Sequence, residues 1–332
     1  MSFVGIIANP ASGKDIRRLV AYGSVFDNQE KVRILRRVLL GLESMGVERI
    51  CYMPDYYGIV ERALFRMKID ASVFPLKFVT RANQNDSIQA ARMMEEQGTT
   101  CVITLGGDGT NRVTAKGNST VPILPISTGT NNVFPYMVEG TIAGLAAGLV
   151  ARRLVPLEES TYPSTKLEVM LDGKCVDLAL VDAAVCDDLF VASRAVWKMD
   201  KIRQIFLNRA EPGNIGFSSI GGLIRSILPD EPHSVCLELG GNGRPVTAPV
   251  APGIIEKVYI KNEKIMNIGD EVEIPFSPSV LALDGEREIE IRRGHFAAIR
   301  LAKDGPIVVD VKRTMESAMK RKILAPDFDS TG

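Results

Sequence analysis

The chain reads Thr104-Leu105-Gly106-Gly107-Asp108-Gly109-Thr110 directly after the apolar run Cys101-Val102-Ile103. Three glycines therefore surround one carboxylate at the end of a predicted buried strand. Glycine lets backbone N–H groups approach a phosphate chain closely, because it carries no Cβ. An aspartate here is suited to bind Mg²⁺ or to accept the proton of an attacking hydroxyl. The alternative is a tight strand-to-helix turn in which the aspartate caps the next helix.

Strand and helix patterns alternate on both sides of this stretch. Strands are predicted at 3–8, 49–53, 76–80, 101–103 and 121–126. Helices are predicted at 31–45, 59–67, 87–96 and 140–152, with a short one after Thr110. Such alternation indicates a parallel sheet covered by helices, which is a three-layer α/β domain.

Glycine-bearing loops follow three of these strands, after Ala8, Leu105 and Ile126. In open parallel sheets, ligands bind at the carboxyl ends of the strands. All three loops leave from that edge, so we expect them to converge on one ligand. Their sequences include Asn9-Pro10-Ala11-Ser12-Gly13-Lys14 and Thr128-Gly129-Thr130-Asn131-Asn132.

Beyond residue 160 the pattern becomes that of a β-rich domain. Asp172-Gly173 lies between two strand patterns at 166–171 and 174–180, which is a strong hairpin signal. Span 187–229 is less clear, and its glycine-rich part at 213–222 is either a mobile loop or a helix start near the site. Further strands are predicted at 235–239, 257–261, 271–274, 280–283 and 288–292.

The last segment returns to a strand pattern at 307–311 and a helix pattern at 315–323. The chain is therefore expected to go back to its first domain. We predict an α/β nucleotide-binding domain at 1–155, joined by segment 305–332, and a β-rich, β-sandwich-like substrate domain at 156–304.

The composition argues against nucleic-acid binding, membrane association and a zinc site. Among 332 residues, 40 basic side chains balance 40 acidic ones, which argues against a nucleic-acid binder and gives no attraction to anionic membranes. Five scattered cysteines and two histidines make a zinc site improbable and indicate reduced thiols in a cytoplasmic protein. The uncharged span 117–138 is interrupted by prolines, so it is not expected to cross a membrane.

Four motifs together resemble the superfamily of NAD kinases and diacylglycerol-type lipid kinases. They are Asn9-Pro10-x-Ser12-Gly13, Gly106-Gly107-Asp108-Gly109-Thr110, Thr128-Gly129-Thr130-Asn131-Asn132 and Asp284-Gly285-Glu286. The opening motif and the form Gly-Gly-Asp-Gly-Thr-Asn-Arg-Val resemble one branch in particular. That branch is the ATP–NAD-kinase-like proteins that include acetoin catabolism protein X.

The resemblance implies a NAD kinase/diacylglycerol kinase-like fold with the active site between two domains. It also implies ATP–Mg²⁺ as phosphoryl donor, a hydroxyl such as that of NAD as acceptor, and a homo-oligomer. Asp108 and Asp284 would be the catalytic and metal-binding carboxylates, and which of them is the base stays open, with Asp108 favoured. Cofactor contacts would come from Asn9, Ser12, Gly13, Lys14, Gly106, Gly107, Gly109, Thr110, Thr128, Gly129, Thr130, Asn131 and Asp182.

Several of these assignments have alternatives. Lys14 and Arg112 are candidates for the phosphate-neutralising cation, although Lys14 could equally be a surface residue. For Asp284-Gly285 the alternative is an ordinary hairpin turn. NAD kinases carry an asparagine before their acidic residue where this chain has Val181-Asp182. Lipid kinases usually carry Asn-Glu-Val where it has Asn111-Arg112-Val113.

The motifs and their departures from the family pattern lead to three alternative hypotheses about function. The leading hypothesis is a small-molecule kinase that phosphorylates NAD or NADH. The second is an enzyme of the same fold that acts on a lipid or a sugar phosphate, for which Phe190, Trp197 and residues 205–207 offer apolar side chains, unless these belong to the core. The third is a nucleotide-binding regulator without catalysis, which the arginine at position 112 would suit and the presence of both aspartates opposes.

Overall fold

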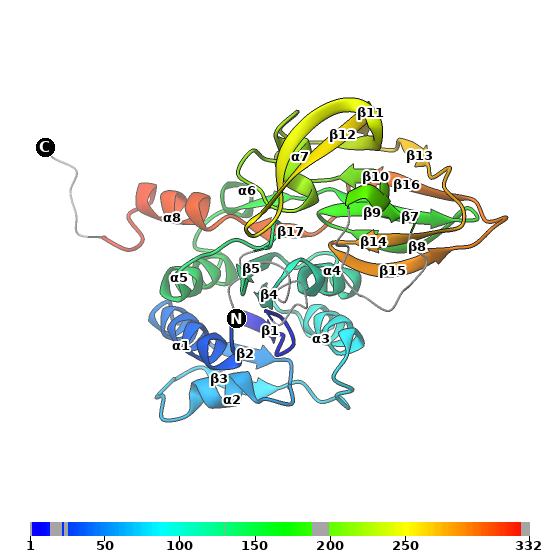
Figure 1. Ribbon diagram of the computed structural model, residues 1–332. Coiled ribbons are helices and arrows are strands. Elements are labelled where there is room, and N and C mark those ends of the chain that lie inside the picture. The colour runs from blue at the N-terminus through cyan, green and yellow to red at the C-terminus, as the bar shows by residue number, and fades with distance from the viewer. Residues whose placement is uncertain (1, 14–21, 23–25, 130, 188–198, 327–332) are drawn as a thin grey trace, which may run out of the picture.

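The computed structural model describes residues 2–13, 22, 26–129, 131–187 and 199–326. Its N-terminal part contains a seven-stranded sheet in the order β3-β2-β1-β4-β5-β17-β6 (Figure 1). All neighbours are parallel except β17 and β6. The strands are β1 (Phe3–Ala8), β2 (Arg49–Tyr52), β3 (Ser72–Pro75), β4 (Cys101–Gly106), β5 (Ile123–Ser127), β6 (Thr161–Pro163) and β17 (Ile307–Val309).

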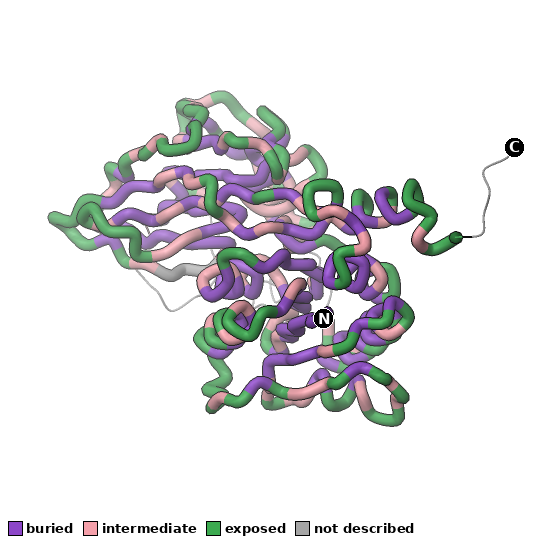
Figure 2. The backbone as a smooth tube through the Cα atoms, turned by 180° about the vertical axis from the view of Figure 1, so that it is seen from behind, coloured by how far each residue is buried: buried purple, intermediate pink, exposed green. Residues whose placement is uncertain are grey.

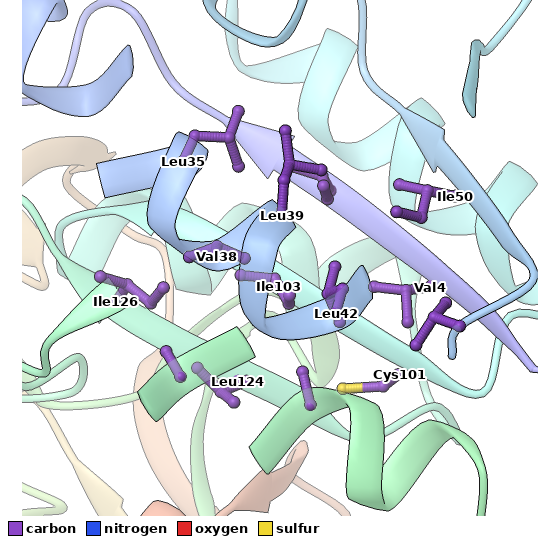
Figure 3. Close-up of a cluster of buried hydrophobic side chains, with 14 of the residues drawn as sticks. Val4, Leu35, Val38, Leu39, Leu42, Ile50, Cys101, Ile103, Leu124 and Ile126 are labelled. Atoms are coloured by element: carbon purple, nitrogen blue, oxygen red, sulfur yellow. The ribbon is translucent and has the colours of Figure 1, made fainter. Parts of the chain in front are cut away.

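Helices cover both faces of this sheet, as the alternating pattern predicts. Successive residues of β1 point to opposite faces, so Val4 and Ile6 pack in one core cluster while Phe3 and Ile7 pack in another. The first cluster contains the apolar faces of α1 and α5 (Figure 3), and the second that of α3. The helices of this part are α1 (Asn28–Ser44), α2 (Ile59–Leu64), α3 (Gln84–Glu96), α4 (Asp108–Gly117), α5 (Gly140–Ala151), α6 (Leu157–Ser160) and α8 (Val311–Lys320).

The second part is built from two antiparallel sheets, in the orders β12-β11-β10-β9-β14-β15 and β13-β16-β7-β8. One core cluster joins Val185 and Leu281 of the larger sheet to Val169 and Ile299 of the smaller one, which is sandwich packing. The strands are β7 (Lys166–Leu171), β8 (Lys174–Ala179), β9 (Asp182–Cys186), β10 (Ile202–Leu207), β11 (His233–Ala251), β12 (Ile254–Asn267), β13 (Glu271–Glu273), β14 (Ser279–Leu283), β15 (Glu286–Ile291) and β16 (Ala297–Ala302).

These two parts confirm the predicted fold class. After the β-rich part, the chain returns to the first sheet through β17, and α8 follows it (Figure 1). Buried residues follow the strands of both parts, while exposed residues lie on outer helix faces and at the tips of hairpins (Figure 2). Within the described residues, no helix combines the length and the apolarity needed to span a membrane.

The structure corrects one strand and defines a region that the sequence left unclear. The strand predicted at 76–80 lies at Ser72–Pro75 instead, because β2 pairs with those residues in register and leaves Lys77 and Val79 outside the sheet. The unclear span contains β10, a short 3₁₀ helix at Met199–Lys201 and helix α7 (Phe217–Gly222). Phe190 and Trp197 lie outside the described residues, whereas Phe206 is a core residue of the sandwich.

Candidate active site

Three loops meet at one edge of the parallel sheet. They follow β1, β4 and β5, which are neighbours in the sheet. The Asn9 side-chain amide donates a hydrogen bond to Thr110 Oγ1 at 2.9 Å. The hydroxyls of Ser12 and Thr128 are 2.9 Å apart and share a hydrogen bond. Side-chain bonds therefore join the first loop to the other two, so the three loops lie together at this edge of the sheet.

The glycines of the second loop are required by its own packing. A Cβ on Gly106 would lie 2.3 Å from Thr110 Oγ1, and one on Gly107 would lie 2.7 Å from Asn132 Oδ1. Both distances are shorter than any van der Waals contact allows. Gly106 therefore makes room for Thr110 at the start of α4, and Gly107 permits the close approach of this loop to the loop after β5.

Asp108 is the first residue of α4, and Gly107 is the N-cap. The Asp108 carboxylate accepts hydrogen bonds from the backbone N–H groups of Val133, at 3.0 Å, and Phe134, at 2.7 Å. The interpretation of Asp108 as the cap of the next helix is therefore wrong, because its side chain reaches across to the loop after β5. These two bonds orient the carboxylate, which is half-buried and lines a pocket.

That pocket lies between the two parts of the chain. Asp108, Asn131 and Val133 line it from the α/β part. Asp182, at the start of β9, lines it from the β-rich part and is 7% exposed. The other lining residues of that part are mostly apolar: Met199, Ile215, Gly216, Phe217, Val250, Ala251, Ile254, Glu256, Asp284 and Gly285. The glycine-rich segment predicted near the site is thus the start of α7 and contributes to this wall.

Asp284 is placed differently from Asp108. Its backbone has a φ of 49° in the turn between β14 and β15, with Gly285 at 82°, so the hairpin interpretation is confirmed. Its carboxylate has no solvent exposure and accepts hydrogen bonds from the N–H groups of Leu180, Val181 and Asp182. Burial raises the pKa of Asp284, and the Arg112 charge and the three N–H groups oppose that rise. In this structure the carboxylate therefore anchors the turn that leads into β9.

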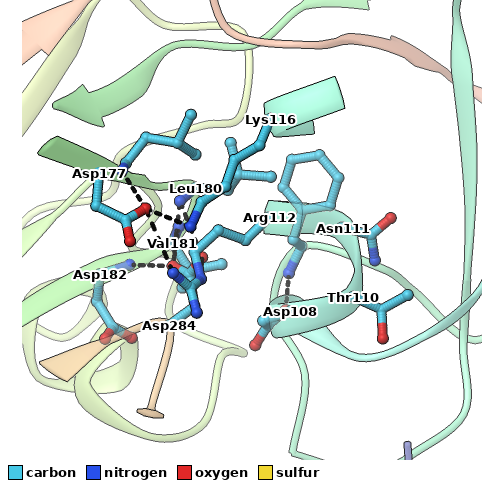
Figure 4. Close-up of polar contacts among 12 residues, drawn as sticks. Asp108, Thr110, Asn111, Arg112, Lys116, Asp177, Leu180, Val181, Asp182 and Asp284 are labelled. Atoms are coloured by element: carbon cyan, nitrogen blue, oxygen red, sulfur yellow. Dashed lines mark hydrogen bonds and ion pairs between the residues drawn. The ribbon is translucent and has the colours of Figure 1, made fainter. Parts of the chain in front are cut away.

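Arg112 and Lys116 extend from α4 toward the β-rich part (Figure 4). The fully buried Arg112 guanidinium lies 3.5 Å from Asp177 and 3.8 Å from Asp284. The Lys116 ammonium lies 2.6 Å from Asp177. The candidate role of Arg112 as a phosphate-binding cation is therefore wrong, because its charge is directed to two carboxylates of the other domain.

The remaining predicted contacts fall into two groups. Gly13, Gly109, Thr110, Thr128, Gly129 and Asn131 belong to the joined loops, and Asn131 lines the pocket. Lys14 and Thr130 lie outside the described residues. For Glu286, only the backbone, at the start of β15, is described.

Sequence reasoning missed Lys31 and Glu256. Glu256 lines the pocket from β12, and no local pattern distinguished it from other strand residues. Lys31 is fully buried, and its ammonium donates to the backbone carbonyls of Asn9 and Ser12. Its signal was available, because a lysine four residues before Leu35 falls on the apolar stripe of α1.

The carboxylates of the pocket are possible ligands of a Mg²⁺ ion. Among the described residues, no group of three or more His, Cys, Asp or Glu side chains is arranged to hold a metal ion. Mg²⁺ is usually held by one or two carboxylates together with substrate phosphates. Asp108 and Asp182 line one pocket and both carry oxygen ligands, so the residues present fit a nucleotide-bound Mg²⁺.

Comparison with known proteins agrees with this architecture. A family model described as the ATP-NAD kinase N-terminal domain matches residues 4–154, and one described as the acetoin catabolism protein X C-terminal domain matches residues 165–304. The chain is 34% identical over 335 residues to acetoin catabolism protein X of Cupriavidus necator, an alignment that covers 97% of this chain and 93% of that protein.

One solved structure shares the fold at low sequence identity, and a second gives a weaker match. Yeast NADH kinase complexed with NADH aligns with a TM-score of 0.53 and 14% identity, covering 100% of this chain and 90% of the other. A diacylglycerol kinase from Bacillus anthracis aligns with a TM-score of 0.47 and 12% identity, covering 93% and 96%. By its full-length identity, the chain belongs to the acetoin catabolism protein X family, with an N-terminal domain of the ATP–NAD kinase type.

Proposed function

We propose that the chain is an ATP-dependent small-molecule kinase that phosphorylates a ribose hydroxyl of NAD or NADH. The observation that carries the proposal is the placement of Asp108, whose carboxylate lines the interdomain pocket beside three loops joined by hydrogen bonds. The match to the ATP-NAD kinase N-terminal domain supports the donor and the class of acceptor.

In this mechanism Asp108 is the general base. The N–H groups of Val133 and Phe134 orient its carboxylate. Asp108 takes the proton from the acceptor hydroxyl as the new bond between the acceptor oxygen and the γ-phosphorus forms and the bond between that phosphorus and ADP breaks. Asp182 lines the same pocket from the other domain and would orient the acceptor by accepting a hydrogen bond from a ribose hydroxyl. Asp284 would act indirectly, by anchoring the turn that positions Asp182.

The donor would lie along the three joined loops. Their backbone N–H groups would contact the phosphates, as glycine-rich loops permit. Bound Mg²⁺ would neutralise charge on the phosphate oxygens, held by those oxygens and by the Asp182 carboxylate, while Asp108 keeps its role as the base. The apolar wall of Ile215, Phe217 and Ile254 would cover a planar base of the acceptor.

The deciding experiment is phosphate transfer from ATP–Mg²⁺ to NAD and to NADH, measured as formation of NADP or NADPH. Asp108→Asn keeps an oxygen that accepts the two N–H bonds but removes the base, so activity should fall by about 10²- to 10⁴-fold. Asp55→Asn is a matched control, because the Asp55 carboxylate also accepts backbone N–H bonds, from Tyr57 and Ile59, without lining the pocket.

Equal activity of Asp108→Asn and the wild type would overturn the role of Asp108. If the wild type binds ATP but forms neither NADP nor NADPH, the acceptor is wrong. A screen with diacylglycerol and sugar phosphates would then test the other acceptors of this fold.

A specific observation favours a second candidate, a nucleotide-binding regulator without catalysis. The Asp284 carboxylate has no solvent exposure, and Arg112 is buried beside it. Both groups act within the protein in this structure, which leaves Asp108 and Asp182 as the aspartates positioned to act on a ligand. ATP binding that is unaffected by Asp108→Asn, with no transfer to any acceptor tested, would support the regulator.

A further inference from the structure

Arg209 is a buried arginine at the junction between the two parts of the chain. It lies two residues after the end of β10 and is 2% exposed. In the part of the chain that the structure describes, no carboxylate forms an ion pair with its guanidinium, and its Nε has no hydrogen-bond partner. A buried charge without a counter-charge costs folding free energy. Stability alone therefore does not account for an arginine at this position.

The backbone that carries Arg209 is fixed within the β-rich part. The side-chain amide of the preceding residue, Asn208, donates to the carbonyl oxygens of Thr165 and Leu180, both at 2.9 Å. The Asn208 backbone N–H donates to the Val181 carbonyl oxygen at 2.8 Å. The Arg209 side chain therefore extends from a well-anchored point.

The Arg209 guanidinium contacts Phe134 of the α/β part in two ways. Its Cζ lies 4.1 Å from the centroid of the Phe134 ring, with the Tyr162 ring at 6.0 Å. A guanidinium in this position is attracted to the face of the ring. Its Nη1 also donates to the Phe134 carbonyl oxygen at 3.4 Å, and its Nη2 donates to Ser164 Oγ at 3.1 Å. Arg209 thus holds both the ring and the backbone of Phe134.

Phe134 lies in the segment that supplies hydrogen bonds to the proposed base. Residues 131–135 belong to neither a helix nor a strand, so regular backbone pairing does not fix them. The Phe134 side chain has no solvent exposure and packs with Val181 of the β-rich part. The N–H groups of Val133 and Phe134 donate to the Asp108 carboxylate at 3.0 and 2.7 Å. A displacement of Phe134 would therefore displace donors that orient this carboxylate.

We propose that Arg209 is a positioning residue for Asp108. It acts through Phe134, because holding the ring and the carbonyl keeps the two N–H groups where they orient the carboxylate. The contact also makes the geometry of the base depend on how the β-rich part packs on the α/β part. This inference rests on the proposed function, in which Asp108 accepts the proton of the acceptor hydroxyl.

Steady-state kinetics of phosphate transfer to NAD separates positioning from substrate binding. Arg209→Met removes the guanidinium and keeps an unbranched apolar side chain. We expect kcat to fall by about tenfold to a hundredfold, since small displacements of a catalytic group cost rate factors of this order. The KM values for ATP–Mg²⁺ and NAD should stay unchanged.

Arg62→Met is the matched control. The Arg62 guanidinium lies 4.2 Å from the centroid of the Tyr57 ring and donates to the Tyr57 carbonyl oxygen at 2.7 Å, and neither residue lines the pocket. This variant loses the same kind of contact away from the base. It should keep the wild-type kcat.

Two further measurements identify the residue through which Arg209 acts. In the Asp108→Asn background, adding Arg209→Met should lower the transfer rate no further, since the group that it positions is no longer a base. Amide hydrogen exchange of the segment that contains Val133 and Phe134 should become faster in Arg209→Met, because its donors are held less firmly. The exchange rate of that segment should stay at the wild-type value in Arg62→Met.

The outcomes distinguish this role from the proposed function. Wild-type kcat in Arg209→Met, unchanged exchange of the segment, or losses that add fully to those of Asp108→Asn would each overturn the role of Arg209 and leave the kinase proposal standing. If Arg209→Met does not fold, Phe134→Leu decides, because it removes the stacked ring and keeps both N–H groups. It should lower kcat and leave KM unchanged, and wild-type kcat would overturn the role. If the wild type forms neither NADP nor NADPH, the proposed function fails, and the role of Arg209 fails with it.

Discussion

At the scale of single residues, Glu95 shows how one carboxylate fixes a turn. It lies near the end of α3, and its Oε1 accepts hydrogen bonds from the N–H and hydroxyl groups of Ser119 and Thr120, at 2.6 to 3.2 Å. Desolvation raises the pKa of Glu95, but the bonds from Thr120 and Ser119 lower it further, so the net pKa lies below the usual 4.5. These bonds hold the segment between α4 and β5.

Glu95→Gln should therefore destabilise the protein in a pH-dependent way. A folded-state pKa below the unfolded value means that Glu95 contributes stability above pH 4.5, and that this contribution is lost as pH falls through the folded-state pKa. We expect the variant to be less stable by about 1 kcal/mol at pH 7, since solvent partly screens this half-buried carboxylate. Urea unfolding at several pH values measures the difference. A gap that widens on acidification would contradict the prediction.

At the scale of elements, the close contact of α1 and α5 depends on glycine. A Cβ on Gly144 would lie 2.2 Å from the Val38 carbonyl oxygen and 3.0 Å from Gly41 Cα. The small residues of α5 let the two backbones approach, and α1 in turn carries Lys31 toward the first loop. The position of the loop is thus linked to the packing of this helix pair.

Gly144→Ala should push the two helices apart. Overpacking of this kind costs about 1–3 kcal/mol, more than the intrinsic gain of alanine in a helix. Gly213→Ala is the matched control, because a Cβ there has nothing within 4 Å. Thermal unfolding of both variants measures the effect. Equal melting temperatures for Gly144→Ala and the wild type would show that α1 and α5 have room that the structure does not indicate.

At the scale of the whole molecule, the cluster of Arg112, Lys116, Asp177 and Asp284 joins the two parts of the chain (Figure 4). It starts on α4, whose first residue is Asp108, and ends on the turn that anchors β9, whose first residue is Asp182. The cluster therefore connects the elements that carry Asp108 and Asp182, which both line the pocket.

Removing only the Arg112 charge should lower the free energy of unfolding more than removing the charges of both Arg112 and Asp284. Arg112→Met leaves the Asp284 charge buried without its cation, which should lower the free energy of unfolding by about 3–5 kcal/mol. In the Arg112→Met background, adding Asp284→Asn removes that charge and should recover part of the loss. Urea unfolding of the two single variants and the double variant measures the coupling. Strictly additive losses would mean that the two residues do not interact.

Much of the fold was predictable because it depends on local periodicity. The apolar stripe of α1, the alternation of strands and helices, and the turn residues Asp172 and Gly173 each specify an element from neighbours in sequence. Strand pairing depends on residues that are farther apart in the sequence. The strand predicted at 76–80 was therefore misplaced, because residues 72–75 of the same apolar stretch are the ones that pair with β2. Long-range pairing likewise set the length of β11 and β12.

The sequence by itself determined the fold class, the three converging loops and Asp108 as a candidate base, because glycine spacing and strand order are carried by neighbouring residues. Only the tertiary structure showed that Asp108 and Asp284 have different surroundings. It also showed that Arg112 lies beside two carboxylates of the β-rich part. Both aspartates sit beside glycines in similar sequence patterns, so their difference lies in what surrounds them. Both residues line the pocket, but the Asp108 carboxylate is half-buried, whereas that of Asp284 has no solvent exposure and is enclosed by three N–H groups and a guanidinium from distant segments. Burial and charge pairing are properties of the packed chain, and no local pattern specifies them.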